Sequence, residues 1–300
     1  MHSEISGLSD YLAEDEMDAL RLCREVVSHL NWNKPEKNIE EVPEEPVYDS
    51  EELLGLVSKD LKTPFDIKEA IARFSDGSRF EEFKPLFGSS IVCGWTHVHG
   101  YPVAIIGNNG AIYPDSSQKA AHFIQLCNKI NTPIIFLQNV TGFLVGKEFE
   151  RDGSIKKGSQ LINAVSNSTV PHITIILGAS YGAGTYAMSG RAFNNRFTFI
   201  WPSAKIAVMG GKQIAGVMSL VRRARAIRKG EKFNEEEDKQ IVAAVEKLQE
   251  DGSRALEATG LVSDDGIIDP RDTRTVIGMC LSIVGNKPMK GTKEFGVFRL

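Results

Sequence analysis

The segment HITIILGASYGAGTYAM, residues 172–188, carries the clearest structural signal in this 300-residue chain. Its β-branched run Ile173–Leu177 predicts a buried strand. The run breaks at the glycine-rich segment Gly178–Gly184, and a helix of small residues is expected to begin at Gly182. A strand, a glycine turn and a helix in this order direct free backbone N–H groups and the positive end of the helix dipole at one point. The segment therefore predicts a site for an anion or for a developing oxyanion.

Two other chemistries can be read into the same residues. Gly178-Ala-Ser180-Tyr-Gly182 matches the G-x-S-x-G nucleophile elbow, but that fold needs a histidine after the serine, and all six histidines precede Ser180. Gly182–Ala187 matches the G-x-G-x-x-A dinucleotide fingerprint, but the following run Phe197–Ala204 lacks the acidic residue that would bind a ribose. Two interpretations remain open: an oxyanion hole made by backbone amides, and a turn that only lets the helix pack closely on the sheet.

The composition is that of an ordinary globular protein. The chain is 42% hydrophobic and 25% charged with a formal net charge of −4, which argues against nucleic-acid binding. Its four cysteines contain no CxxC pair, so neither a zinc ribbon nor a disulfide framework is expected, and no metal site is predicted. Because no apolar run reaches the length of a membrane span and no signal core is visible, we expect no membrane association. The expected location is cytoplasmic, or the mitochondrial matrix in a eukaryote.

Predicted strands and helices alternate along the chain, which favours an α/β fold with helices packed around mostly parallel strands. A first helix at 10–30 precedes a proline-rich and acidic stretch, and His99-Gly100 is expected to close a hairpin. Further helices are expected at 50–57, 67–74, 117–131, 157–168, from 182, from 211 and at 236–258. Strands are expected at 90–98, 101–106, 133–138, 173–177, 196–200 and 205–209.

Glycine and amide side chains follow two more of these strands. Gln138 and Asn139 end one strand and lead into Thr141-Gly142, and Gly107-Asn-Asn-Gly110 follows another. Since α/β folds place ligands at the carboxyl edge of the sheet, these ends and the glycine turn together predict a ligand surface. The alternative for Asn108 and Asn109 is that they only form turns.

Three longer blocks, Gln138–Gly146, Ser180–Met188 and Ile200–Gly211, resemble the carboxyltransferase (β) subunit of biotin-dependent acyl-CoA carboxylases. Supporting blocks lie at Ile105–Gly110, Lys119–Cys127 and Asp264–Arg274. The Asn-Val-Thr-Gly-Phe and Gly-Ala-Gly-Thr segments look closer to the methylcrotonoyl-CoA and geranyl-CoA carboxylase type than to the propionyl-CoA type. The resemblance implies a crotonase-like (ClpP/crotonase) ββα superhelix domain.

Family β subunits contain two such domains, and this chain looks like the C-terminal one. Residues 1–32 would then be the trailing helix of a missing N-terminal carboxyltransferase domain, 33–50 a linker, and 51–300 the C-terminal acyl-CoA carboxyltransferase domain. In the family, the N domain holds the CoA and the C domain of the facing subunit holds biotin. The implied partners are that N-terminal domain, a biotin carboxylase and biotin carboxyl carrier subunit that brings the biotin, and further copies in dimers within a hexamer.

The resemblance also assigns roles by position. The backbone N–H groups of Ala183 and Gly184 would form the hole for the ureido oxygen of biotin. Biotin is expected to contact Gly142, Phe143, Tyr181 and Gly182. The acyl-CoA substrate is expected to contact Asn108, Asn109, Gly110 and Thr141. The implied reaction moves CO2 from carboxybiotin to the alpha or gamma carbon of an acyl-CoA, with the cofactor as base.

Three alternatives remain. The chain could be a non-catalytic C-domain fragment or scaffold, a decarboxylating carboxyltransferase of the same family, or a crotonase-type hydratase or isomerase. The last would need its own Glu or His base, and Ser180–Met188 offers none. We expect Ser180 to be no nucleophile and His122 to be structural, whereas Tyr181 and Tyr186 could either pack or touch a ligand.

Overall fold

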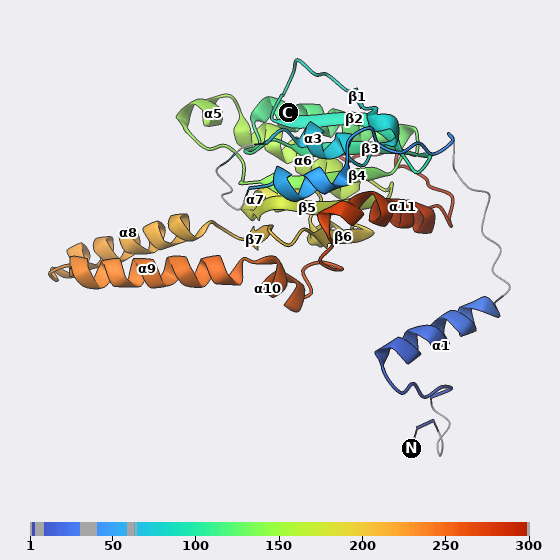
Figure 1. The fold of residues 1–300 in the computed structure, drawn as a ribbon. Coiled ribbons are helices and arrows are strands. Elements are labelled where there is room, and N and C mark those ends of the chain that lie inside the picture. Colours follow the sequence, from blue (N-terminus) through green and yellow to red (C-terminus); the bar gives the residue numbers. More distant parts are fainter. Residues whose placement is uncertain (1, 4–8, 31–40, 59–62, 64, 299–300) are drawn as a thin grey trace. The chain divides into compact units, whose positions relative to one another are not determined.

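The computed structural model describes residues 2–3, 9–30, 41–58, 63 and 65–298 (Figure 1). The chain forms two compact units, Met1–Lys37 and Asn38–Leu300. In the first, helix α1 (Glu16–Ser28) starts later than the predicted 10–30 because Asp15 caps it, accepting a hydrogen bond from the N–H of Asp18. The first part of the predicted linker at 33–50, up to residue 40, lies outside the described residues.

A sheet of seven strands, counted within the described residues, forms the centre of the second unit. The strand order is β1-β2-β3-β4-β5-β6, and β7 pairs with the end of β5. The pairs from β1 to β3 are antiparallel, while β3 to β6 and the β5–β7 pair are parallel, which confirms the predicted mixed α/β fold. The strands are β1 (Glu81–Glu82), β2 (Ile91–Val98), β3 (Tyr101–Asn108), β4 (Ile134–Val140), β5 (His172–Tyr181), β6 (Phe197–Ile200) and β7 (Lys205–Ala207).

Helices cover both faces of this sheet because successive strand side chains point to opposite sides. Ile134 and Phe136 of β4 pack into a core with α4 and α6, whereas Ile135 and Leu137 pack into a second core with α2, α3 and α11. Fully burying a side chain of this size is worth about 1.5–3 kcal/mol. The helices are α2 (Leu53–Leu56), α3 (Ile67–Ala72), α4 (Pro114–Lys129), α5 (Lys147–Arg151), α6 (Ser154–Asn167), α7 (Gly182–Ala187), α8 (Gly211–Lys229), α9 (Glu235–Gly252), α10 (Ala255–Gly260) and α11 (Thr273–Val284).

Strand β5 runs further than the sequence predicts. Gly178–Tyr181, expected as part of the turn, is strand because Ala179, Ser180 and Tyr181 pair with Lys205, Ile206 and Ala207 of β7. The side chain of Asn139 also fixes this end, since its Oδ1 accepts a hydrogen bond from Ala179 N at 3.2 Å. The turn is therefore confined to Gly182.

The predicted helix at 236–258 is two helices. Helix α9 ends at Gly252, and the chain then pairs with β7. Ile206 N donates to Ser253 O at 2.8 Å, and the backbones of Lys205 and Arg254 form an antiparallel β-bridge. Figure 1 shows α8 and α9 lying side by side and extending away from the sheet. In the described part of the chain, no helix is both long and apolar enough to cross a membrane.

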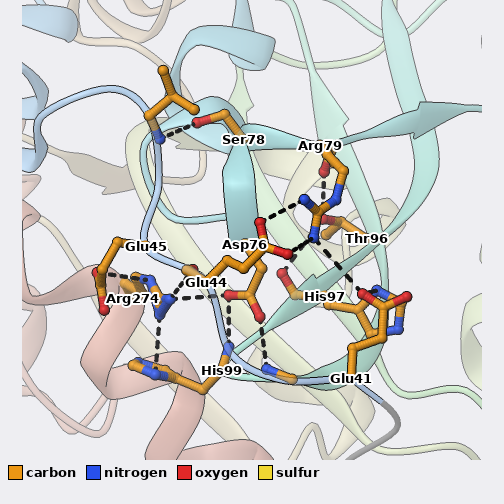
Figure 2. A network of polar contacts seen from close by, with 12 residues as sticks. Glu41, Glu44, Glu45, Asp76, Ser78, Arg79, Thr96, His97, His99 and Arg274 are labelled. Carbon is orange, nitrogen blue, oxygen red and sulfur yellow. Dashed lines mark hydrogen bonds and ion pairs between the residues drawn. The ribbon is translucent and has the colours of Figure 1, made fainter.

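A buried carboxylate joins three parts of the second unit (Figure 2). The predicted hairpin is confirmed, with His99 and Gly100 at φ 51° and 76°. The carboxylate of Asp76 accepts hydrogen bonds from the N–H of His99 at 2.9 Å and of Gly100 at 2.7 Å. It also pairs with Arg274 of α11 at 3.0 Å, and Arg274 donates to the carbonyl of Glu44. This contact network ties the hairpin, α11 and the segment before α2 together.

Candidate active site

The predicted glycine turn lies where β5 meets α7. Gly182 has φ +56°, and a Cβ at this position would lie 3.0 Å from the carbonyl oxygen of Val208, so glycine suits the turn for two reasons. No side chain of the described residues caps α7. The N–H groups of its first turn, which include those of Ala183 and Gly184, therefore have no partner within the helix.

This turn opens onto a cavity of about 610 Å³. Five residues predicted from sequence line it together, although they come from two strand ends: Thr141, Gly142, Tyr181, Gly182 and Ala183. The remaining wall is formed by the segment 205–213, from β7 to the start of α8, and by Glu246 and Glu250 of α9. The structure thus brings the ends of β4 and β5 to one concave surface, as the sequence predicts.

Gly184 lies behind the cavity and is buried. A Cβ on this residue would come within 2.5 Å of Val140 Cγ2 and 3.3 Å of Gly142 Cα. Only glycine therefore lets α7 lie this close to the end of β4, which places the first turn of α7 beside the wall at Gly142.

The hydroxyl of Ser180 serves the fold. It is fully buried and donates to Gln138 Oε1 at 2.6 Å, with Thr185 Oγ1 at 2.8 Å. Gln138 in turn donates from Nε2 to the carbonyl of Met188 at 2.7 Å. These bonds hold Thr185, in α7, and Met188, just after it, on the sheet, and they support the expectation that Ser180 is no nucleophile.

The structure places Asn108, Asn109 and Gly110 away from the cavity wall. Asn108 is fully buried, donates to the carbonyls of Gly110 and Asn139 at 2.7 Å each, and accepts from Asn139 N at 2.8 Å. Asn109 accepts from Ile67 N at 2.8 Å. These side chains join the ends of β3 and β4 and the start of α3, so the geometry does not bring them together with Thr141 as a substrate site.

Phe143 also lies off the cavity wall. Its ring packs on the core under α4 and α6, next to Gly158, where a Cβ would come within 3.1 Å of the ring. The ring packs into the space that Gly158 leaves, so Phe143 does not line this cavity, whereas the resemblance implies that it contacts biotin.

Two ion pairs on the wall are absent from the sequence prediction. Lys205 of β7 pairs with Glu250 of α9, and Lys212 of α8 lies 3.9 Å from Glu246. Burial and then the charge of Glu250 raise the pKa of the half-buried Tyr181. In the sequence, only the resemblance of the block Ile200–Gly211 points to this part of the wall, and it implies no role for Lys205. Among the described residues there is no group of three or more His, Cys, Asp or Glu arranged to hold a metal ion.

The sheet, the helices on its faces and the glycine turn define a crotonase-like α/β protein. Residues 1–298 match the family described as the carboxyl transferase domain, and the chain belongs to this family, which confirms the predicted resemblance.

Relatives of this chain are β subunits of acyl-CoA carboxylases. The whole chain is 56% identical over 301 residues to the probable biotin-dependent acyl-coenzyme A carboxylase beta2 subunit of Mycobacterium tuberculosis, covering 57% of that protein. It is 43% identical over 302 residues to the mitochondrial methylcrotonoyl-CoA carboxylase beta chain of Dictyostelium discoideum, covering 51% of it. It matches the solved beta subunit of P. aeruginosa geranyl-CoA carboxylase with a TM-score of 0.81 and 43% identity, covering 100% of this chain and 57% of that one. The chain therefore spans about half the length of the curated relatives it matches.

Proposed function

We propose that this chain is the carboxyltransferase component of a biotin-dependent acyl-CoA carboxylase, moving CO2 from carboxybiotin to the alpha or gamma carbon of an acyl-CoA. The observation that carries the proposal is the cavity at the uncapped N-terminus of α7, beside a serine that is buried and hydrogen-bonded. Such a site can stabilise negative charge on an oxygen, while the hydroxyl of Ser180 is engaged in the fold and does not line the cavity. Membership of the carboxyl transferase family supports the same activity.

The residues of the cavity fit the head group of biotin. Gly142 and Gly182 leave part of the wall without side chains, so a flat ring can approach the backbone beside Ala183. The first-turn N–H groups of α7 offer donors to a ureido oxygen. When bound, carboxylated biotin would supply both the CO2 and the base that the acyl-CoA requires.

The chain's own contribution is then electrostatic. The amides of Ala183 and Gly184, with the helix dipole behind them, stabilise negative charge on an oxygen placed at the start of α7. Tyr181 lines the same cavity, and burial followed by the charge of Glu250 raises the pKa of its hydroxyl. Thr141 and Gly142 close the side of the cavity formed by β4.

The substrate and partners of the whole protein form the second part of the proposal. The acyl-CoA would be held mainly by an N-terminal carboxyltransferase domain, because Asn108–Gly110, which the resemblance assigns to the acyl-CoA, are engaged in the fold. Biotin would arrive on a biotin carboxyl carrier partner, and copies of the protein would pair as dimers within a hexamer. The Dictyostelium relative is named as mitochondrial, and we propose the matrix for a eukaryotic source and the cytoplasm for a bacterial one.

The test is biotin-dependent decarboxylation of carboxylated acyl-CoAs by the chain, alone and with the N-terminal carboxyltransferase domain of a relative. Ala183→Pro removes one first-turn donor at a position where helices tolerate proline. It should lower kcat by about 10²-fold or more, while Ala183→Gly, which keeps the N–H, should stay active. Glu236→Pro, at the same second position of α9, is the matched control and should also stay active.

Each outcome has a separate meaning. Full activity in folded Ala183→Pro would refute the assigned site. An inactive wild-type chain in both assays would favour a scaffold or fragment. Activity of the chain alone would mean that it also holds the CoA.

A second candidate is a hydratase or isomerase, because α9 brings two carboxylates, Glu246 and Glu250, to the cavity. Each already forms an ion pair with a lysine of the cavity wall, Glu250 with Lys205 and Glu246 with Lys212. Enoyl-CoA hydration that is lost in Glu246→Gln or Glu250→Gln would favour this candidate over carboxyl transfer.

A further inference from the structure

The two ion pairs of the cavity wall differ in burial. The side chain of Lys205 is 19% exposed in its pair with Glu250, whereas that of Lys212 is 71% exposed near Glu246. Water screens the charge of an exposed lysine, but a charge held in a wall acts across the cavity. Lys205 is therefore the cation whose charge matters most for a ligand in this space.

The backbone fixes both partners of this pair. Lys205 lies opposite Ala179, two residues before Tyr181, in the parallel pairing of β7 with β5. Its backbone also forms an antiparallel β-bridge with Arg254, which lies just after α9, the helix that carries Glu250. The ammonium and carboxylate groups are thus held next to the strand end that leads into α7.

We propose that Lys205 is a positioning residue of this site that acts through Glu250: its ammonium group neutralises Glu250 and so lets the cavity hold negative charge beside Ala183. This inference rests on the proposed function. Without Lys205, the Glu250 carboxylate would repel an oxyanion at the start of α7 and oppose the stabilisation by the amides. The pair acts on charge that develops during the reaction rather than on the neutral ligand.

A double-mutant cycle in the decarboxylation assay tests this. Lys205→Gln should lower kcat roughly tenfold, with the KM for uncharged biotin amide within about twofold of wild type. Adding Glu250→Gln should bring kcat back to within about threefold of wild type, and Lys205→Arg should retain it. The control is Lys239→Gln, which breaks an exposed pair with Glu236 at 3.0 Å on the same helix, outside the cavity. A double variant as impaired as Lys205→Gln would overturn the proposal, because a packing role predicts that result.

A second measurement needs no substrate. Tyr181 shares the cavity with Lys205, Lys212, Glu246 and Glu250, and its pKa is already raised by burial and by Glu250. Lys205→Gln should raise the pKa of Tyr181 further, and the added Glu250→Gln should bring it down again. Both shifts are measured by tyrosinate absorbance, with Tyr181→Phe as the reference variant. If these shifts occur in a chain that has no carboxyltransferase activity, Lys205 does neutralise Glu250 and only the proposed function is wrong. Equal titrations of the single and double variants would overturn the inference even in an active enzyme.

Discussion

Replacing Arg274 with methionine tests how much the buried ion pair with Asp76 stabilises the second compact unit. Methionine keeps an unbranched apolar stem but removes the guanidinium group. The substitution breaks the 3.0 Å ion pair and the hydrogen bond to the carbonyl of Glu44. Asp76 then remains as a buried charge without its cation.

The magnitude follows from burial. Asp76 is 1% exposed and the side chain of Arg274 is 9% exposed. Removing one partner of a buried pair costs about 3–5 kcal/mol. The N–H groups of His99 and Gly100 still satisfy Asp76, so we expect the lower end, about 3 kcal/mol. For a unit of this size, 1 kcal/mol shifts Tm by about 2–4 °C, so Tm should fall by about 6–12 °C.

A second readout comes from His99, whose Nδ1 lies 3.0 Å from Arg274. A guanidinium group only donates, so Nδ1 is the acceptor and the ring proton lies on Nε2. Burial and then the charge of Arg274 lower the pKa of His99, whereas Asp76 raises it. Removing Arg274 should therefore raise the pKa of His99.

The assays are thermal unfolding by circular dichroism and an NMR pH titration of the histidines. Arg271→Met is the matched control, because Arg271 is 43% exposed and pairs with Asp269 and Glu51 on the surface. This variant should leave Tm nearly unchanged. If Arg274→Met and Arg271→Met lower Tm equally, or if the pKa of His99 does not rise in Arg274→Met, the reasoning is wrong.

Three further predictions concern buried groups. Ser180→Ala should lose about 1–2 kcal/mol of stability but keep carboxyl transfer; a folded, inactive variant would point to a nucleophile instead. Burial lowers the pKa of His172 to about 4 from 6.5, so between these values the unfolded chain binds a proton that the folded chain does not. The free energy of unfolding should therefore fall by up to about 1.4 kcal/mol per pH unit as the pH drops from 6.5 towards 4, and His172→Gln should lack this component in urea titrations; an unchanged slope would contradict it. Of the four cysteines, only the exposed Cys23 should react quickly with a thiol reagent in the native state, and a second fast thiol would contradict the buried placement of the others. The buried thiols, with pKa values raised by burial, are Cys93, Cys127 and Cys280.

The sequence predicts the elements whose signal is local. Ile173–Leu177 is strand because β-branched residues fill a pleated, buried surface. His99-Gly100 closes a two-residue hairpin, as the sequence predicts. The start of α7 at Gly182 is predicted for the same reason, because the glycine pattern itself sets the turn.

The features that the sequence does not predict depend on contacts between residues that lie far apart along the chain. Gly178–Tyr181 resembles a turn by composition, and only pairing with β7 makes it strand. Phe143 turns inward because Gly158, on another helix, leaves space for its ring. Lys205 and Glu250 lie far apart along the chain and meet only because α9 folds back along α8. The backbone part of the site is thus predictable, whereas its charged wall is not.

The most direct test of the central claim is an amide NMR titration of the chain with biotin amide. We predict the largest shifts at the N–H groups of Gly182, Ala183 and Gly184, with smaller shifts at Gly142 and little change at Asn109 and Gly110. Saturable shifts at the start of α7 that Ala183→Pro abolishes would support biotin binding by these amides. Saturable shifts elsewhere, with α7 unchanged, would contradict the account.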